Sequence, residues 1–292
     1  MYRALADAIR DAEQQGISLA RLALETEAKD QGRAIDDIRD ALRRALHVMR
    51  GAVERGMVGD LHSASGLVGG DAAKLRTGPD GPLAGTPFRD VLARALAVQE
   101  VNAAMGVIVA APTAGGAGVL PAVLTGLADA RRLTDDAVVD ALAVAGLIGA
   151  VIAERASLSG AEGGCQAETG AAAAMAAGAA TEMLGGTPAQ VGHATALAMQ
   201  GTLGLVCDPL GGLVELPCVF RNATGSAIAL TGIELALAGI EFRIPVDEVI
   251  DVMGEIGASM DVRYRETAGG GLAATPTGRR LARERLVQIK KR

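Results

Sequence analysis

The segment of residues 171–184 is rich in alanine, and up to residue 180 only Met175 and Gly178 interrupt the alanines. Alanine has the highest helix propensity, and its short side chain lets neighbouring helices approach closely. Hydrophobic residues make up 50% of the 292-residue chain, yet only 2% are aromatic and tryptophan is absent. The core must therefore be built from Ala, Val, Leu, Ile and Met. Since no strand-like alternation is sustained over several segments, we expect an all-α fold with one predominantly helical domain.

Apolar residues recur at helical spacing from residue 1 to about residue 55, which predicts two or three amphipathic N-terminal helices. The apolar run 141–153 belongs to a helix that Thr134 caps and that we place at the centre. The run is too short to cross a bilayer. The basic tail, 279–292, is expected to be a terminal helix or a frayed end. Further helices are expected over residues 88–110, from 121, over 171–184, 187–205 and 219–238, and after 245.

Charge and cysteine content limit the kind of partner and the compartment. The net charge is −6, from 34 acidic and 28 basic residues, so no basic surface for nucleic acid is indicated. Three cysteines do not form a disulfide framework and fit a reducing compartment. The first residues are charged and lack the apolar region of a signal peptide. We expect a cytoplasmic, soluble protein that contacts neither nucleic acid nor membrane.

The three cysteines, Cys165, Cys207 and Cys218, are separated by 42 and 11 residues, and each lies near Gly or Pro. We interpret them as ligands of an iron–sulfur cluster, because thiolates are soft ligands that suit this chemistry. Cys165 precedes the alanine-rich helix, whose dipole favours a thiolate. Two alternatives stay open: small buried hydrophobic residues, and zinc ligands, although no Cys-x-x-Cys pair is present.

Three cysteine ligands would leave one corner of a cubane [4Fe–4S] cluster free, because such a cluster normally takes four. The open iron could act as a Lewis acid on a hydroxyl leaving group. This arrangement indicates dehydration chemistry rather than electron transfer.

Two segments rich in small residues are candidates for ligand binding. Residues 56–87 contain many glycines and prolines around a polar centre, 63–74, and a loop of this length is usually functional or disordered. We favour function. Residues 112–121 form a second such loop, whose backbone amides could face an anion such as a carboxylate. It is not a Walker motif, since no Gly-Lys-Ser/Thr follows, and an ordinary turn between helices is an equal alternative.

Several stretches carry a resemblance to a known family: Ser-Gly-Leu-Val-Gly-Gly-Asp-Ala at 65–72, Ala-Pro-Thr-Ala-Gly-Gly-Ala-Gly at 111–118, Ser-Leu-Ser-Gly-Ala-Glu-Gly-Gly-Cys-Gln at 157–166, Cys-Asp-Pro at 207–209, Pro-Cys at 217–218, Arg-Asn-Ala at 221–223 and Tyr-Arg-Glu-Thr at 264–267. The chain resembles the separate alpha subunit of the two-subunit iron–sulfur-dependent L-serine dehydratases, from about residue 60 to about 275. The cysteine loops are specific to this family, whereas the N-terminal helices are not. The resemblance implies a mainly helical fold in which Cys165, Cys207 and Cys218 bind a [4Fe–4S] cluster.

The implied reaction converts L-serine to pyruvate and ammonia without pyridoxal phosphate. A base would take the Cα proton while the open iron assists loss of the hydroxyl group. Single-chain relatives carry an additional domain with a Ser-Ser-His-Thr type motif, so a partner beta subunit is expected to supply those groups here. Such relatives also end in a cysteine that caps the open iron, and this chain has none.

Candidate substrate-binding residues come mainly from the two small-residue loops and are Ser63, Ser65, Gly69, Gly70, Thr113, Gly115, Gly116, Asn222 and Arg265. Ser63, Ser65 and the glycines could hold a carboxylate through hydroxyl groups and backbone amides, and Asn222 could be a supporting donor. Arg265 could bind a carboxylate or form a structural ion pair with Glu266.

Candidate catalytic groups are His62, beside the first loop, and Lys74, which could pair with the substrate carboxylate or lie on the surface. His47 and His193 are expected to be structural. Glu162 and Glu168 flank Cys165, where they could transfer protons or support the cysteine loop.

Three alternatives to the dehydratase hypothesis remain. A related lyase such as a cysteine desulfidase would release sulfide from cysteine. A non-catalytic iron–sulfur sensor would bind the cluster without turnover. A helical scaffold with incidental cysteines would contain no iron.

Overall fold

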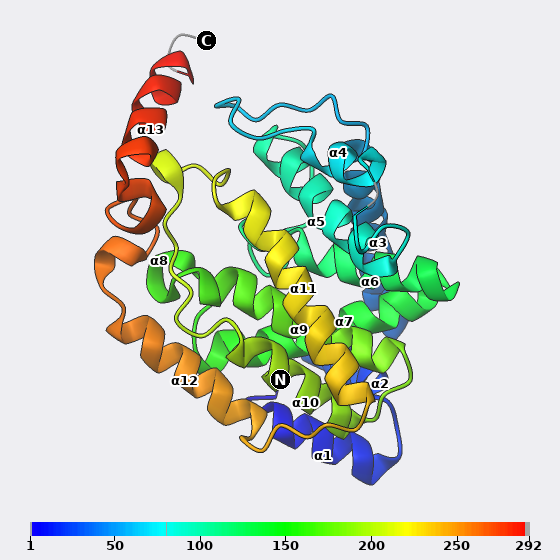
Figure 1. Ribbon diagram of the computed structural model, residues 1–292. Helices are drawn as coiled ribbons and strands as arrows, with labels where there is room; N and C mark the ends of the chain where they lie inside the picture. Colours follow the sequence, from blue (N-terminus) through cyan, green and yellow to red (C-terminus); the bar gives the residue numbers. More distant parts are fainter. Residues whose placement is uncertain (1, 80, 290–292) are drawn as a thin grey trace.

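The computed structural model describes residues 2–79 and 81–289, with side chains as far as Glu284. Within these ranges the chain forms helices and no strand (Figure 1), which confirms the expected all-α fold. The helices are α1 (Leu5–Gln15), α2 (Leu19–Gln31), α3 (Ile35–Gly56), α4 (Asp71–Thr77), α5 (Pro87–Ala103), α6 (Val119–Arg131), α7 (Asp135–Arg155), α8 (Gly160–Gly163), α9 (Ala171–Met183), α10 (Pro188–Gln200), α11 (Cys218–Leu237), α12 (Val246–Ser259) and α13 (Pro276–Ile289).

The alanine-rich helix α9 lies at the centre and packs against α6, α7, α10 and α11. Its residues from Ala171 to Thr181 are all buried, because the helix presents small side chains on every face. At Gly178 an added Cβ would lie 2.4 Å from the Cδ1 of Ile148 and 2.5 Å from the Oγ1 of Thr195. Glycine at this position lets α7 and α10 both approach α9. The expected small-residue core is therefore present.

Helix α7 begins where its cap predicts, since the Thr134 hydroxyl accepts a hydrogen bond from the amide of Ala137 at 3.3 Å. With 21 residues, α7 is long and apolar enough to cross a membrane by length and composition. The expectation that this segment is too short to span a bilayer considered only the run 141–153, which is part of the helix. However, 61% of its most apolar window is buried inside the protein, as in the core helix of a soluble protein. The helix thus gives only weak evidence of a membrane span.

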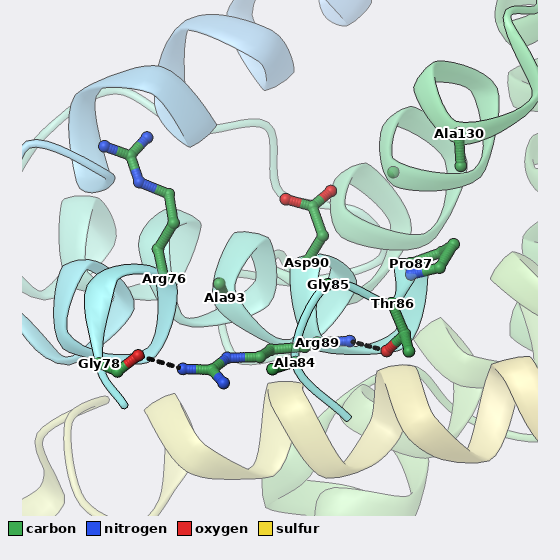
Figure 2. Close-up of a pocket in the computed structure, with 11 residues that line it drawn as sticks. Arg76, Gly78, Ala84, Gly85, Thr86, Pro87, Arg89, Asp90, Ala93 and Ala130 are labelled. Carbon is green, nitrogen blue, oxygen red and sulfur yellow. Dashed lines mark hydrogen bonds between the residues drawn. The ribbon is translucent and has the colours of Figure 1, made fainter. Parts of the chain in front are cut away.

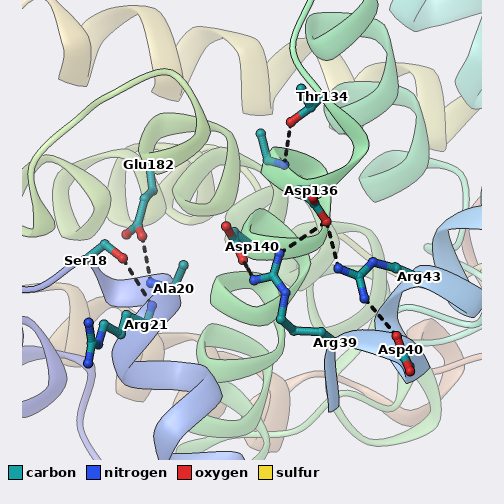
Figure 3. A network of polar contacts seen from close by, with 11 residues as sticks. Ser18, Ala20, Arg21, Arg39, Asp40, Arg43, Thr134, Asp136, Asp140 and Glu182 are labelled. Carbon is teal, nitrogen blue, oxygen red and sulfur yellow. Dashed lines mark hydrogen bonds and ion pairs between the residues drawn. The ribbon is translucent and has the colours of Figure 1, made fainter. Parts of the chain in front are cut away.

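The three N-terminal helices contribute to the same hydrophobic core as α7 and α9. Ion pairs join α3 to α7 (Figure 3): Asp136 pairs with Arg39 at 3.3 Å and with Arg43 at 2.9 Å. The Glu182 carboxylate, at the end of α9, accepts hydrogen bonds from the amides of Leu19 at 3.1 Å and Ala20 at 2.7 Å. It thereby caps the first turn of α2 from a distant part of the chain.

Two other helices begin without a capping side chain of their own and use the same arrangement. The Asp247 carboxylate accepts from the amides of Leu5 and Ala6 at 2.8 and 3.0 Å, and the residue before α1 is Ala4. The Glu100 carboxylate in α5 accepts from the first amides of α4. The first amides of a helix have no partner within it, so these distant carboxylates join sequence-remote elements.

Several helix boundaries differ from the predictions. The helix expected over 88–110 ends at Ala103, because the Gly106 amide bonds back to the Val101 carbonyl at 2.8 Å and closes the helix. The helix expected to open at Pro121 already begins at Val119, and that expected over 187–205 ends at Gln200. In the basic tail, α13 projects from the body of the molecule (Figure 1), and residues 290–292 lie outside the described residues.

Candidate active site

The three cysteines come from three segments, and all are free and buried. Cys165 directly precedes a π-helical turn, Gln166–Gly170, that continues into α9. Cys218 is the first residue of α11. Cys207 lies on extended chain, where its amide donates to the Tyr264 carbonyl and its carbonyl accepts from the Glu266 amide, each at 2.8 Å.

Electrostatic effects indicate that the three thiols are neighbours. Burial is the main cause that raises the pKa of each, to about 12 for Cys218. Nearby Cys165 and Cys218 raise the pKa of Cys207 further, and Cys165 also raises that of Cys218. Among the described residues, no three His, Cys, Asp or Glu side chains lie close enough together to bind one metal ion directly. The three thiols nevertheless share one region.

The loop of residues 112–121 reaches the cysteines through Glu168. One carboxylate oxygen of Glu168 accepts a hydrogen bond from the Thr113 hydroxyl at 2.6 Å, and the other lies 3.8 Å from the Cys207 Sγ. A Cβ added at Gly115 or Gly116 would come within 2.9 Å of Glu168 atoms, so only glycine permits this approach. Burial raises the pKa of Glu168. Three of the predicted binding residues therefore lie beside Glu168, which in turn contacts Cys207.

Asn222 holds the same loop from the other side. Its amide nitrogen donates to the carbonyls of Gly115 and Cys218 at 2.7 and 2.9 Å, and its oxygen accepts from the Gly118 amide at 2.9 Å. Both N–H groups of the side chain are thus used within the protein. Asn222 connects the loop to Cys218, and it offers no free donor to a substrate in this conformation.

A feature that sequence reasoning missed is Glu215, which is 3% exposed and binds the first small-residue loop. Its carboxylate accepts hydrogen bonds from the Ser63 hydroxyl at 2.7 Å, the Ser65 amide at 3.1 Å and the Ser65 hydroxyl. Ser63 and Ser65 were predicted to bind a substrate carboxylate, and here they bind this one. An acidic residue inside the apolar run before Cys218 was the available signal.

The other residues predicted around this loop take different positions. Gly69 has φ of 144°, and a Cβ there would lie 2.2 Å from the Leu61 carbonyl oxygen, while Gly70 has φ of 76° at the start of α4. His62 is exposed beside buried Ser63. The Lys74 ammonium is on the surface and pairs with Asp71 at 2.8 Å, which agrees with the surface alternative.

Arg221 was not singled out, although it belongs to the quoted Arg-Asn-Ala stretch. Its guanidinium donates to the Val206 carbonyl at 2.8 Å and pairs with Asp208 at 2.7 Å, so it binds the residues on both sides of Cys207. It lies almost one helical turn after Cys218. The positive charge of Arg221 favours the thiolate forms of Cys165 and Cys218, against the effect of burial on their pKa values.

A cavity of about 450 Å³ lies next to Cys207 and is lined in part by Thr113, Ser159, Gly160, Glu168 and Glu266. It is adjacent to Cys207 because a Cβ added at Gly160 would lie 3.2 Å from the Cys207 Sγ. Hydroxyl groups and carboxylates on its wall can orient the hydroxyl and ammonium groups of a small polar molecule.

A second cavity, of about 410 Å³, shares Ser157 and Glu162 with the first and is also lined by Arg155 and Arg265. Of the two alternatives for Arg265, the ion pair with Glu266 is not formed within the described ranges, and the two residues line different cavities. A third cavity, of about 510 Å³, lies at the start of α5 around Arg89 and Thr86 (Figure 2), and no cysteine lines it.

The family model for the serine dehydratase alpha chain matches residues 14–273. The chain is 46% identical to the probable L-serine dehydratase alpha chain of Bacillus subtilis over 288 residues, covering 97% of this chain and 95% of that one. It is 40% identical to the L-serine dehydratase alpha chain of Peptoniphilus asaccharolyticus, covering 93% and 94%. It is 42% identical to the longer L-serine dehydratase of Streptomyces coelicolor, of which it covers 60%.

Proposed function

Because the chain belongs to the serine dehydratase alpha chain family, we propose that it is the catalytic subunit of an enzyme that converts L-serine to pyruvate and ammonia. We propose further that Cys165, Cys207 and Cys218 hold a [4Fe–4S] cluster. The observation that carries this proposal is the grouping of three free, buried thiols, of which Cys207 lies next to a cavity lined by hydroxyl groups and carboxylates. Such a site suits a cluster better than zinc, since each thiolate of a cluster binds a different iron atom.

The bound cluster would supply a Lewis-acidic iron at its open corner to activate the serine hydroxyl as a leaving group. The residues of this chain would bind and orient the substrate. Glu168 and Glu266, on the wall of the cavity beside Cys207, offer carboxylates to the α-ammonium group. The Thr113 hydroxyl donates a hydrogen bond to Glu168, which fixes the orientation of that carboxylate.

Asn222 and Glu215 would act on the shape of the site rather than on the substrate, since each joins a loop to the segment around Cys218. His62 remains our proposed acid–base group, as its exposed position beside Ser63 leaves the ring accessible. Removal of the Cα proton and loss of hydroxide release water and an enamine. Its imine tautomer takes up water to give pyruvate and ammonia, so the overall reaction is balanced.

We propose that a beta subunit completes the site. The alpha chains of B. subtilis and P. asaccharolyticus match this chain over nearly their full lengths, whereas it covers only 60% of the longer S. coelicolor protein. A separate partner chain would supply the remaining portion. We also propose one helical catalytic domain, with α1–α3 as its scaffold, in a reducing cytoplasmic compartment that keeps the three cysteines free.

The decisive experiment is anaerobic purification followed by iron and acid-labile sulfide analysis, and by a pyruvate assay with L-serine in the presence and absence of a co-expressed beta subunit. We expect equal amounts of iron and sulfide, and turnover that depends on the partner. Cys207→Ser should lose both cluster and activity. Protein without iron that was never exposed to air would refute the cluster, and sulfide release from L-cysteine without pyruvate from serine would indicate a desulfidase.

A further inference from the structure

Two arginines, Arg155 and Arg265, line the cavity of about 410 Å³ that shares Ala156, Ser157 and Glu162 with the cavity beside Cys207. The Nε atoms of Arg155 and Arg265 are both buried, and neither has a hydrogen-bond partner within the described residues. Most of the rest of the wall is alanine and glycine, together with Ser157, Glu162 and Met253. The small residues leave open space beside the two arginine side chains.

The two arginines differ in how their charge is balanced. Arg155 pairs with Asp251 at 2.6 Å and lies 3.9 Å from Asp247. Arg265 forms no ion pair or side-chain hydrogen bond within the residues that the structure describes. Arg265 is partly exposed, and its buried Nε has no partner within the described residues. Its charge is therefore available to an acceptor that enters the cavity.

This cavity adjoins the one beside Cys207 but has different charged groups on its wall. Arg265 and Glu266 are consecutive, but Arg265 lines the cationic cavity while Glu266 lines the cavity that contains Thr113 and Glu168. The backbone at Arg265 pairs with Cys207 in an isolated bridge. An occupant bound to Arg265 would thus lie behind the cysteine segment and not among the groups that face the thiol.

We propose that the Arg155–Arg265 cavity is a binding site for a small carboxylate, separate from the site of the reaction. The planar guanidinium group matches a carboxylate with two parallel hydrogen bonds. A volume of about 410 Å³ suits a small molecule. Glu162, whose carboxylate accepts from the Ser157 hydroxyl at 2.6 Å, places a negative charge on the same wall. It disfavours multiply charged anions and can accept the ammonium group of an amino acid.

Pyruvate and L-serine both carry the required α-carboxylate. Their choice as ligands rests on the proposed function, because they are its product and its substrate, whereas the site itself rests only on the arrangement of charges. Through the Cys207–Arg265 backbone pairing, an occupied site can stabilise the segment that carries Cys207. The stability of the cysteine segment would therefore depend on the concentration of substrate or product.

The test is isothermal titration of the full-length chain, purified anaerobically without its partner, with pyruvate, L-serine and inorganic phosphate as separate probes. Arg265→Gln is compared with Arg263→Gln, whose side chain is 58% exposed and pairs with Asp261. We expect wild type and Arg263→Gln to bind pyruvate or L-serine, and Arg265→Gln to bind at least about tenfold more weakly. Arg265→Lys should fall between them, because it keeps the charge but loses the planar fork.

The ligand of the site is identified as whichever of pyruvate and L-serine binds wild type more tightly than it binds Arg265→Gln. Absence of binding by both, equal binding by wild type and Arg265→Gln, or selective binding of phosphate would each overturn the proposal. Thermal unfolding of each variant checks that the fold is retained, and Arg265→Lys replaces Arg265→Gln if the latter does not fold. Failure of the cluster analysis leaves this binding result intact, so the two proposals fail independently.

Discussion

The carboxylate of Glu215 accepts a hydrogen bond from the hydroxyl of Ser63 at 2.7 Å, although 152 residues separate the two in the chain. This contact attaches the glycine-rich loop to the segment just before Cys218. The Glu215 carbonyl also accepts from the Val219 amide at 2.9 Å, in the first turn of α11. The residue therefore fixes both a loop and the start of the helix that presents a proposed cluster ligand.

Replacing Glu215 with Gln should lower the free energy of unfolding by about 1–3 kcal/mol, because an NH₂ group would replace one acceptor in a buried site with several donors. Urea denaturation measures this change. The matched control is Glu234→Gln, on the exposed face of α11, which should leave stability nearly unchanged. Equal stability of wild type and Glu215→Gln would mean that the contact with Ser63 is not needed to hold the loop.

Arg221→Gln should weaken retention of the proposed cluster by about tenfold or more, the usual range for groups that support metal ligands. The variant loses both the positive charge near the thiols and the contacts with Val206 and Asp208. Its reduction potential should also become more negative, because electron uptake no longer benefits from that charge. Iron release to a chelator and a redox titration followed by electron paramagnetic resonance measure the two effects.

Arg221→Lys separates charge from geometry, as it should retain most of the potential but not the full stability of the cluster. Arg280→Gln, an exposed change in α13, serves as the control. If Arg221→Gln and Arg280→Gln release iron at the same rate and show the same potential, Arg221 has no part in supporting the cluster.

His62→Ala should reduce kcat of the partner-bound enzyme by about 10²–10⁴-fold, the range for loss of a general acid or base. Iron content should change little, because the exposed His62 ring is not among the groups that contact the cysteines. Steady-state pyruvate formation and iron analysis of the same preparations test whether kcat falls while iron content stays nearly constant. His47→Ala, on exposed α3, is the control. An unchanged kcat would remove His62 from the mechanism.

The sequence predicted those features that depend on neighbouring residues. Thr134 marked the start of α7, and the spacing of small residues around α9 indicated a close-packed helical core. The grouping of Cys165 with Cys207 and Cys218 was predicted from thiolate chemistry and from family resemblance, since no local rule brings residues 42 positions apart together. Residues 112–121 and Glu168 were each noted, but their contact depends on how a loop meets a helix from another part of the chain.

Contacts between distant polar groups could not be predicted in this way. The carboxylates that cap α1, α2 and α4 belong to α12, α9 and α5. A sequence can show that a helix such as α1 begins without a capping side chain of its own. It can also show an acidic residue within an apolar helix, but it does not show that the two will meet. Arg221 and Glu215 likewise have partners across the fold, and ordinary arginine and glutamate residues give no sign of which partner they will meet.

Glu100 provides a pH-dependent test of these distant caps. It is 1% exposed, one carboxylate oxygen accepts from the amides of Asp71 at 2.6 Å and Ala72 at 3.2 Å, and the other is buried without a partner. Burial raises its pKa above the ordinary value of 4.5, and the two amides oppose that shift. The folded state therefore binds the Glu100 proton more tightly than the unfolded state. Its contribution to stability is full below about pH 4.5 and is lost as the pH rises through the folded-state pKa.

Glu100→Gln removes this titration. Relative to the variant, wild type should therefore have its highest free energy of unfolding at low pH. This advantage should shrink or reverse as the pH rises. The slope cannot exceed about 1.4 kcal/mol per pH unit, the limit for one proton. Urea denaturation from pH 4.5 upward measures it. Glu168 and Glu182 have pKa values raised by burial too, but they are unchanged in the variant and cancel in the comparison. The exposed Glu255→Gln should track wild type. A difference that stays constant with pH would show that Glu100 is ionised alike in both states, so that its two amide contacts fully offset its burial.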